Sequence, residues 1–161
     1  MDRRFDDCHV SKAITGFDGP ALYENMRVED MLECIGLGVH PRVACEQSFH
    51  LSDKCYSIKT RDYRLIASFG VCPTEDPDTG CAWLLGTDLM PTIKKTFVKH
   101  SKEYLDDLMD GYERLTNIVS MNNKLSVRWL TWLGAEFGES HGSDFRRFTI
   151  NRKNKELCVI Q

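Results

Sequence analysis

Several side chains are able to take part in acid–base chemistry by type alone. They are Glu46, His50, His100, Glu136 and His141. A general base works only when a neighbouring group holds it in position, and no partner stands at a fixed spacing from any of them. The turn at 141–144 contains His141, Ser143 and Asp144, the residue types of a hydrolytic triad. Neighbours within one turn cannot face one another as a triad requires, so the catalytic groups stay unassigned.

The cysteines indicate thiols rather than a disulfide or zinc framework. They are Cys8, Cys34, Cys45, Cys55, Cys72, Cys81 and Cys158. Their number is odd and no two follow a C-x-x-C spacing, which argues against both frameworks. Cys72 and Cys81 flank one loop and His100 follows, but four ligands do not come together. We predict small, partly buried thiols in a reducing compartment and no bound metal.

Length and charge limit the class of protein. The 161 residues are 42% hydrophobic and 28% charged, which suffices for one core without a disulfide or metal. With 21 basic and 24 acidic residues, the formal charge of −3 argues against binding nucleic acid. The chain has no apolar run of about eighteen residues and no signal peptide, so we expect it in the cytoplasm and away from membranes. We predict one domain over 1–161, with a loosely packed arm at 1–25 where glycine and proline interrupt the pattern.

Hydrophobic periodicity predicts four helices. At 27–37, the spacing of Val28, Met31, Leu32 and Ile35 gives one apolar stripe, the pattern of a helix that packs by one face. A second helix begins at Pro41 and runs to about residue 51. The longest begins near Pro91 or Thr92, and a fourth covers 124–133. The long helix repeats apolar residues every three or four positions, at Ile93, Phe97, Tyr104, Leu105, Leu108 and Met109.

Period-two alternation and short apolar runs predict the strands. They fall at about 56–58, 65–71, 81–86, 116–121, 136–140 and 145–151. The acidic segment 72–80 reads as an exposed hairpin loop. The order of elements predicts an α+β fold with a mostly antiparallel sheet and one parallel crossover.

This order, and several sequence blocks, resemble the GNAT (Gcn5-related N-acetyltransferase) fold. Residues 117–123 (NIVSMNN) and 126–137 (SVRWLTWLGAEF) look like its fifth strand, the following helix and the Gly-Phe signal, with the phenylalanine displaced by two residues. Blocks at 24–30, 82–88, 122–137 and 145–150 are similar to the GNAT-like internal virion protein family of short-tailed bacteriophages. The matched blocks span about residues 24–152.

The resemblance implies an acetyl-CoA site, whose pyrophosphate would lie on the loop that enters the long helix. That loop, 86–95, offers the Thr87 and Thr92 hydroxyls and the Lys94 ammonium, with Lys95 beside it. Asp88 would repel phosphate and Pro91 has no N–H to donate, so the donor pattern is depleted. If the two parallel strands splay, the strand of Trp83, Leu84 and Leu85 would offer backbone groups to the pantetheine arm that the resemblance implies.

Two more positions bear on catalysis. Asn122 occupies the place of the family's asparagine, which contacts pantetheine, although a helix cap explains it equally well. Leu130 occupies the place of the usual tyrosine acid, and leucine has no proton to give. Tyr104 and Tyr112 fall on the core face of the long helix and are interpreted as packed aromatics. Trp129 and Trp132 share one helix face and are assigned to the core, and either would anchor a protein contact if exposed.

Two functions follow from the resemblance. The first is a bacteriophage protein that acts in assembly of the virion's internal core without catalysis, with other core proteins as partners. It would be found in the cytoplasm of the infected bacterium or in the virion. The alternative is an acetyl-CoA-dependent N-acetyltransferase that modifies a host or phage protein. The depleted loop and Leu130 favour the first, and the fold and Asn122 favour the second.

Overall fold

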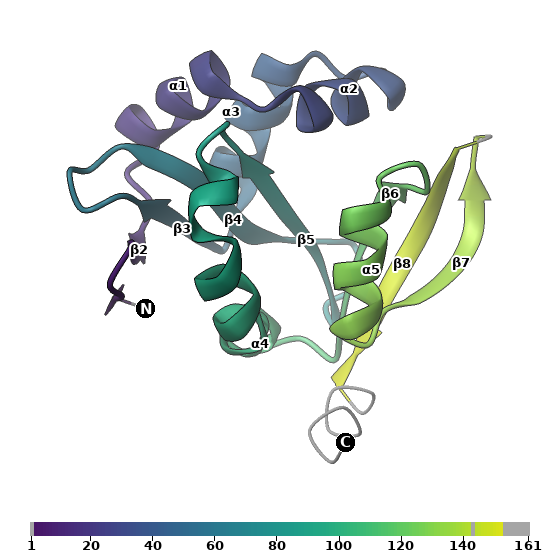
Figure 1. Cartoon of the computed structure of the whole chain (residues 1–161). Helices are drawn as coiled ribbons and strands as arrows, with labels where there is room; N and C mark the ends of the chain where they lie inside the picture. The colour runs from purple at the N-terminus through teal and green to yellow at the C-terminus, as the bar shows by residue number, and fades with distance from the viewer. Residues whose placement is uncertain (1, 143, 153–161) are drawn as a thin grey trace.

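A single mixed sheet organises the protein. The computed structural model describes residues 2–142 and 144–152 (Figure 1). The strand order is β1-β2-β3-β4-β5-β6-β8-β7. The strands are β1 (Arg3–Arg4), β2 (His9–Lys12), β3 (Lys54–Lys59), β4 (Leu65–Pro73), β5 (Thr79–Gly86), β6 (Arg114–Ser120), β7 (Glu136–His141) and β8 (Phe145–Asn151). All neighbours are antiparallel except β5 and β6, so the predicted α+β plan with one parallel crossover is confirmed.

Helices cover both faces of this sheet. They are α1 (Thr15–Asn25), α2 (Val28–Gly36), α3 (Pro41–Leu51), the 3₁₀ helix η1 (Met90–Ile93), α4 (Lys94–Met109) and α5 (Lys124–Trp132). On one face, α1 and α3 pack through Leu22, Cys45 and Phe49. On the other face, α4 and α5 pack over a larger cluster (Figure 1). Within the described residues, no helix has the length and apolar character needed to cross a membrane.

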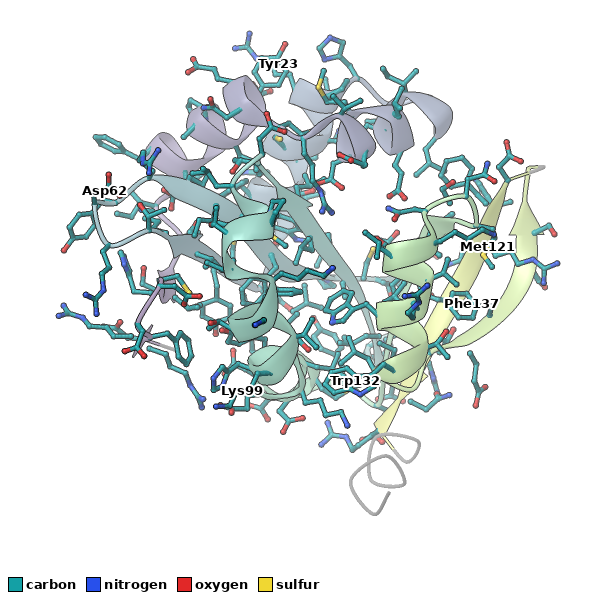
Figure 2. The ribbon with its side chains drawn as sticks, in the orientation of Figure 1. Tyr23, Asp62, Lys99, Met121, Trp132 and Phe137 are labelled. Carbon is teal, nitrogen blue, oxygen red and sulfur yellow. The ribbon has the colours of Figure 1, made fainter. Side chains whose placement is uncertain are left out.

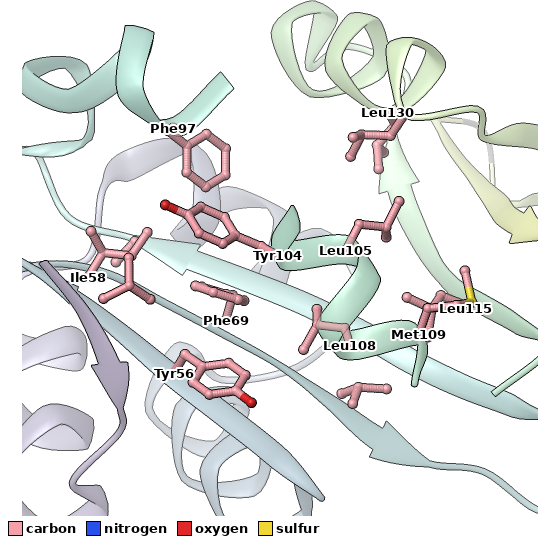
Figure 3. Close-up of a cluster of buried hydrophobic side chains, with 14 of the residues drawn as sticks. Tyr56, Ile58, Phe69, Phe97, Tyr104, Leu105, Leu108, Met109, Leu115 and Leu130 are labelled. Atoms are coloured by element: carbon pink, nitrogen blue, oxygen red, sulfur yellow. The ribbon is translucent and has the colours of Figure 1, made fainter. Parts of the chain in front are cut away.

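The main core lies between the sheet and α4 (Figure 3). The predicted apolar face of the long helix is buried, including Phe97, Tyr104 and Leu108. Phe69 on β4 is 3% exposed, and its ring lies 5.5 Å from that of Tyr56 and 5.3 Å from that of Tyr104. The three-and-four spacing therefore places this face on the sheet as expected.

The predicted loose arm is wrong for residues 3–25, which hold regular elements that contribute to both buried clusters. They form β1, β2 and α1, and both Val10 and Leu22 are fully buried. Asp18 on α1 is 2% exposed and accepts hydrogen bonds from the Ile14 N–H and the Ser57 hydroxyl, both at 2.8 Å. Its carboxylate also pairs with the Lys59 ammonium at 2.8 Å. The bonds to Ser57 and Lys59 are long-range, and they hold a helix that glycine and proline weaken locally.

The helix α2 turns its apolar stripe toward solvent. Val28, Leu32 and Ile35 are 61%, 61% and 60% exposed. The inward face instead carries Asp30 and Cys34, which are 3% and 8% exposed. The predicted helix is confirmed, but its orientation reverses what an amphipathic pattern indicates.

Candidate functional site

The ladder between β5 and β6 is short, and a cleft opens where it ends. Only Thr79 to Cys81 pair with Arg114 to Thr116, although both strands continue beyond these residues. Past this point a cavity of about 650 Å³ lies between the strands. Residues on both faces of the sheet line it, from Phe97 and Tyr104 on α4 to Cys34 on α2. The cavity therefore passes through the sheet rather than lying on one side of it.

Asn117 bridges the mouth of this gap. Its Nδ2 donates to the Ala82 carbonyl across the gap at 2.7 Å, and its Oδ1 accepts from the Ile118 N–H at 2.7 Å. The side-chain amide thus takes the place of one peptide in the interrupted ladder. The position of Asn117 inside the apolar run of β6 was the signal for this bridging role. Asn117 was not identified from the sequence as a site residue.

The free edge of β5 presents the N–H and C=O of one residue to the cleft. Ala82 and Gly86 direct backbone groups away from β4, to Asn117 and to α2 respectively. Residues of an antiparallel strand alternate in the neighbour to which their N–H and C=O point. Leu84 lies midway between them, so its peptide groups face the cleft, while those of Leu85 face β4. Both side chains line the cavity, so these two predicted residues do come to the site.

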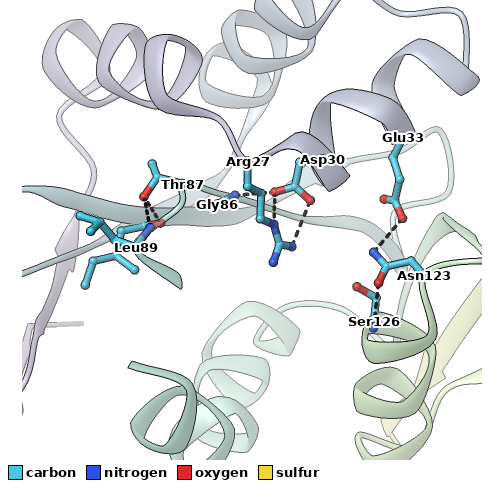
Figure 4. A network of polar contacts seen from close by, with 9 residues as sticks. Arg27, Asp30, Glu33, Gly86, Thr87, Leu89, Asn123 and Ser126 are labelled. Atoms are coloured by element: carbon cyan, nitrogen blue, oxygen red, sulfur yellow. Dashed lines mark hydrogen bonds and ion pairs between the residues drawn. The ribbon is translucent and has the colours of Figure 1, made fainter. Parts of the chain in front are cut away.

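A buried ion pair fixes the upper end of β5 to α2 (Figure 4). Asp30 accepts from Arg27 Nε at 2.7 Å, from Arg27 Nη2 at 3.0 Å and from the Gly86 N–H at 2.7 Å. The Arg27 N–H in turn donates to the Gly86 carbonyl at 2.9 Å. We call this set the Asp30 clip. Loss of hydration raises the pKa of Asp30, even though Arg27 and the Gly86 N–H favour its charged form.

Glu33 adds a second carboxylate to the cavity wall. Its Oε1 accepts from Asn123 Nδ2 at 3.1 Å, while Asn123 Oδ1 caps α5 by accepting from the Ser126 N–H at 3.2 Å (Figure 4). Burial raises the pKa of the Glu33 carboxyl, and the charge of nearby Asp30 adds to this. The cavity therefore carries one carboxylate whose nearest bonded partner is a neutral amide.

Replacing Glu33 by glutamine is expected to stabilise the protein at neutral pH. Because the pKa of Glu33 is raised in the folded state, the folded chain binds more protons than the unfolded chain at pH values between the unfolded and folded pKa of this group. The contribution of Glu33 to the free energy of unfolding therefore falls as the pH rises between those two values. Glu33→Gln keeps an acceptor for Asn123 and removes the buried charge. Urea denaturation at about pH 5 and about pH 7 should show that the free energy of unfolding falls less between these two pH values for the variant than for the wild type. Glu75→Gln, in the exposed β4–β5 loop, is the control, and equal pH profiles for the two variants would contradict the assignment.

The loop that enters α4 uses its own hydrogen-bond donors. The N–H groups of Met90 and Thr92 donate to the carbonyls of Thr87 and Leu89 at 3.1 and 3.0 Å, within the 3₁₀ turn. The Thr92 hydroxyl donates to the Leu89 carbonyl at 2.6 Å. Asp88 lies exposed in the same loop. These donors do not fit a pyrophosphate, because the groups that would bind it are already bonded within the loop.

Thr87 has a structural role rather than the predicted cofactor contact. It is 2% exposed, and its hydroxyl lies 3.0 Å from the carbonyls of Leu65 and Ile66. Its Oγ1 also accepts from the Leu89 N–H at 3.3 Å. Lys94 is exposed at the start of α4, and neither Thr92 nor Lys94 lines the cavity.

Asn122 lies exposed in the turn after β6 and away from the cavity lining. The capping role falls to the next residue, Asn123. Leu130 is 6% exposed and lines the cavity, so an apolar side chain stands where the resemblance implied an acid.

The acid–base candidates chosen by type do not line the cleft. Glu46 pairs with Arg42 on the surface at 3.0 Å, and His50, Glu136 and His141 are exposed. His100 Nδ1 lies 3.1 Å from Glu103, and loss of hydration lowers the pKa of its imidazole. Ser143 of the rejected triad lies outside the described residues.

Of the two tyrosines, only Tyr104 lines the cavity. It is 4% exposed, and burial raises the pKa of its phenol. The Tyr112 hydroxyl lies outside the cavity and donates a hydrogen bond to Asp53. Burial, together with this hydrogen bond, raises the pKa of Tyr112 to about 12.

The two tryptophans of α5 differ. Trp129 lines the cavity, its Nε1 donates to the Ser101 hydroxyl at 3.2 Å, and its ring lies 5.2 Å from that of Phe97. Trp132, labelled in Figure 2, lies at the end of α5 and is 44% exposed. The Lys102 ammonium lies 4.4 Å from its ring centre. The core assignment is therefore wrong for Trp132.

The described cysteines are free thiols, as predicted. Burial is the main cause that raises the pKa of Cys8, Cys45 and Cys55, each to about 12. In the part of the chain that the structure describes, no three His, Cys, Asp or Glu side chains are grouped to hold a metal ion. Cys158 lies outside the described residues.

The open parallel seam and the helices around it define the class of fold. The chain superposes on a GNAT-family acetyltransferase from Bacillus anthracis with a TM-score of 0.63 and 14% identity, covering 95% of this chain and 99% of that one. With the GNAT domain of S. lividans PAT the TM-score is 0.68 at 13% identity, covering 93% and 96%. The protein therefore has the GNAT fold.

The sequence itself is similar to a bacteriophage protein. Residues 77–142 match the family described as Bacteriophage T7, probable scaffold protein Gp13. The probable scaffold protein gp13 of Escherichia phage T7 is 29% identical over 129 residues, which cover 76% of this chain and 84% of that protein. These matches confirm the predicted resemblance to a phage protein family with a GNAT-like fold.

Proposed function

We propose that this chain acts in assembly of the internal core of a bacteriophage virion, through protein contacts and without acetyl transfer. The observation that carries the proposal is the similarity over most of the chain to a phage protein named as a probable scaffold protein. Its partners are other core proteins of the virion, and it works in the infected bacterium or within the particle.

The geometry of the cleft supports the non-catalytic part of this proposal. A bound pyrophosphate needs free N–H donors at the start of α4, where the 3₁₀ turn uses those of Met90 and Thr92. Leu130 offers no proton at the place where a leaving thiolate would need one. The Gly86 N–H belongs to the Asp30 clip. Together these features favour a GNAT fold whose polar groups at the cleft bond within the protein and do not serve acetyl transfer.

The peptide of Leu84 favours the second candidate function, an acetyl-CoA-dependent N-acetyltransferase. That peptide faces the cleft and could pair with an amide-bearing chain such as pantetheine. A host or phage protein would then be the substrate.

A melting experiment separates the two functions. Acetyl-CoA at a hundred times its dissociation constant would add about 2.7 kcal/mol, which shifts the melting temperature of a domain of this size by several degrees. We expect no shift at millimolar acetyl-CoA, with an active GNAT enzyme as the positive control. A clear shift would show that acetyl-CoA binds and would count against an assembly role without acetyl transfer.

Particle composition tests the assembly role directly. Phage grown without a functional copy of this chain should yield particles in which mass spectrometry finds the core proteins reduced or missing, and a plasmid-borne copy should restore them. Particles of normal core composition and infectivity in the absence of the chain would contradict the assembly role.

A further inference from the structure

Two cysteines lie side by side on the sheet at the wall of the cavity. Cys72 on β4 and Cys81 on β5 are directly opposite each other in the antiparallel ladder, so their side chains share one face of the sheet. That face is the one that α3 covers, because the Cys72 thiol lies 3.5 Å from the hydroxyl of Ser52, the residue after α3. Both cysteines are partly exposed and both line the cavity. Two thiols therefore meet where a small reagent can reach them.

The strand register brings this pair within the range of a disulfide. The N–H and C=O of Cys81 point to β4, as those of Leu85 do, so Cys81 and Cys72 exchange both backbone hydrogen bonds. The Cα atoms of such a pair lie about 5.5 Å apart. Cysteines joined by a disulfide usually have Cα atoms about 4.4–6.8 Å apart, so a bond here leaves the ladder in place.

The neighbouring strand carries a third cysteine that is less well placed. Cys55 on β3 lies opposite Gly70, which is two residues from Cys72 along β4. Diagonal neighbours of this kind lie about 7–8 Å apart, which exceeds the usual separation in a disulfide. The register therefore selects Cys81 and not Cys55 as the partner of Cys72.

We propose that Cys72 and Cys81 form a redox pair that closes reversibly into a disulfide when oxidised glutathione, or a similar small disulfide, enters the cavity. One thiolate attacks a sulfur of oxidised glutathione, which gives a mixed disulfide and releases one glutathione thiolate. The second thiolate attacks the protein sulfur of that mixed disulfide, forms the Cys72–Cys81 bond and releases the second glutathione. Two protein thiols are oxidised, one glutathione disulfide is reduced, and the two protons pass to the departing thiolates.

The spacing of the strands favours a bond that opens again. Opposite Cβ atoms in an antiparallel pair lie about 4.5–5.5 Å apart, whereas a disulfide holds them at about 3.5–4.5 Å. Closing the bond therefore draws β4 and β5 together, and strained disulfides are the easily reduced ones. Cys81 is also the last residue of β5 that pairs with β6, so the bond would lie where the cleft begins. This inference does not rest on the assembly role.

Oxidation of the native chain, followed by peptide mapping, tests the pair. Burial raises the pKa of both thiols, so oxidised glutathione is added at about pH 9 to increase the thiolate fraction. After free thiols are alkylated, trypsin together with a protease that cleaves after glutamate places Cys55, Cys72 and Cys81 on three separate peptides. We expect the peptides of Cys72 and Cys81 to be linked, and excess reduced glutathione to separate them. Linkage of Cys72 to Cys55, mixed disulfides alone, or a bond that excess reduced glutathione leaves intact would each overturn the proposal.

Serine variants and an unfolded control show whether the fold selects the pair. Cys72→Ser and Cys81→Ser should each give a mixed disulfide at the remaining thiol and no link between the two peptides. The matched control on β3, Cys55→Ser, should link Cys72 and Cys81 to the same extent as the wild type. In urea the ladder is lost, and oxidation should give several pairings. A native chain that gives the same mixture as the chain in urea, or a Cys55→Ser variant that loses the link, contradicts the assignment.

Discussion

Replacing Asp30 by alanine is expected to lower the free energy of unfolding by about 3 kcal/mol. The change leaves the Arg27 guanidinium without its carboxylate and the Gly86 N–H without an acceptor. Removing one member of a buried pair is costly because the other charge stays behind. The Arg27 side chain is 23% exposed and gains some hydration, which places the loss at the lower end of the usual range.

Urea denaturation measures this loss, and the chain offers a matched control. Glu46→Ala also removes an acid from a helical ion pair, with Arg42 at 3.0 Å, but both side chains are about two-thirds exposed. That substitution should cost about 0.5 kcal/mol or less. If the two variants lose similar amounts, the Asp30 clip is not what holds α2 to β5.

Replacing Phe69 by alanine should cost about 3–5 kcal/mol, the usual range for a buried aromatic. Its ring is packed between those of Tyr56 and Tyr104 and also lines the cleft. The neighbouring rings belong to a strand and a helix that cannot both collapse into the space. The loss therefore combines lost burial with an enlarged cavity.

The control for this variant is Phe17→Ala. Phe17 is 79% exposed on α1, so the same deletion should change the free energy of unfolding by less than about 0.5 kcal/mol. Denaturant midpoints of both variants, with the slopes compared to the wild type, give the measurement. A loss below about 1 kcal/mol at Phe69 would show that the core relaxes around the missing ring.

Most of the elements could be predicted from local pattern, because each pattern is set by residues close in the chain. The helix expected from Pro41 to about residue 51 is α3 (Pro41–Leu51), and the predicted face of α4 is buried. The orientation of α2 could not be predicted. Its inward face is chosen by a hydrogen bond between Asp30 and Gly86, which are 56 residues apart.

The N-terminal elements also could not be predicted, because contacts with residues far away in the chain hold them in place. Glycine and proline in α1 are weak helix formers, and the bonds of buried Asp18 to Lys59 and Ser57, with the packing of Leu22, keep that helix on the sheet. Of the proposed cofactor residues, Leu84 and Leu85 reach the cleft, because their place on β5 follows from strand order. Asn117 was missed because its partner carbonyl, Ala82, belongs to another strand 35 residues earlier.

The three-residue ladder between β5 and β6 has a consequence for cooperativity. Strands β2 to β5 pair in chain order, whereas β6, β7 and β8 form a separate set joined to them by few backbone hydrogen bonds. The two halves are then held together largely by side-chain packing beneath the cleft, such as the contact of the Phe97 ring with the Trp129 ring. Because the backbone ladder is short here, we expect local opening to begin at this seam, where the halves are joined mainly by side chains of the shared core. A molecule or protein segment that bonds to both strand edges would couple the halves, so that the two respond as one unit.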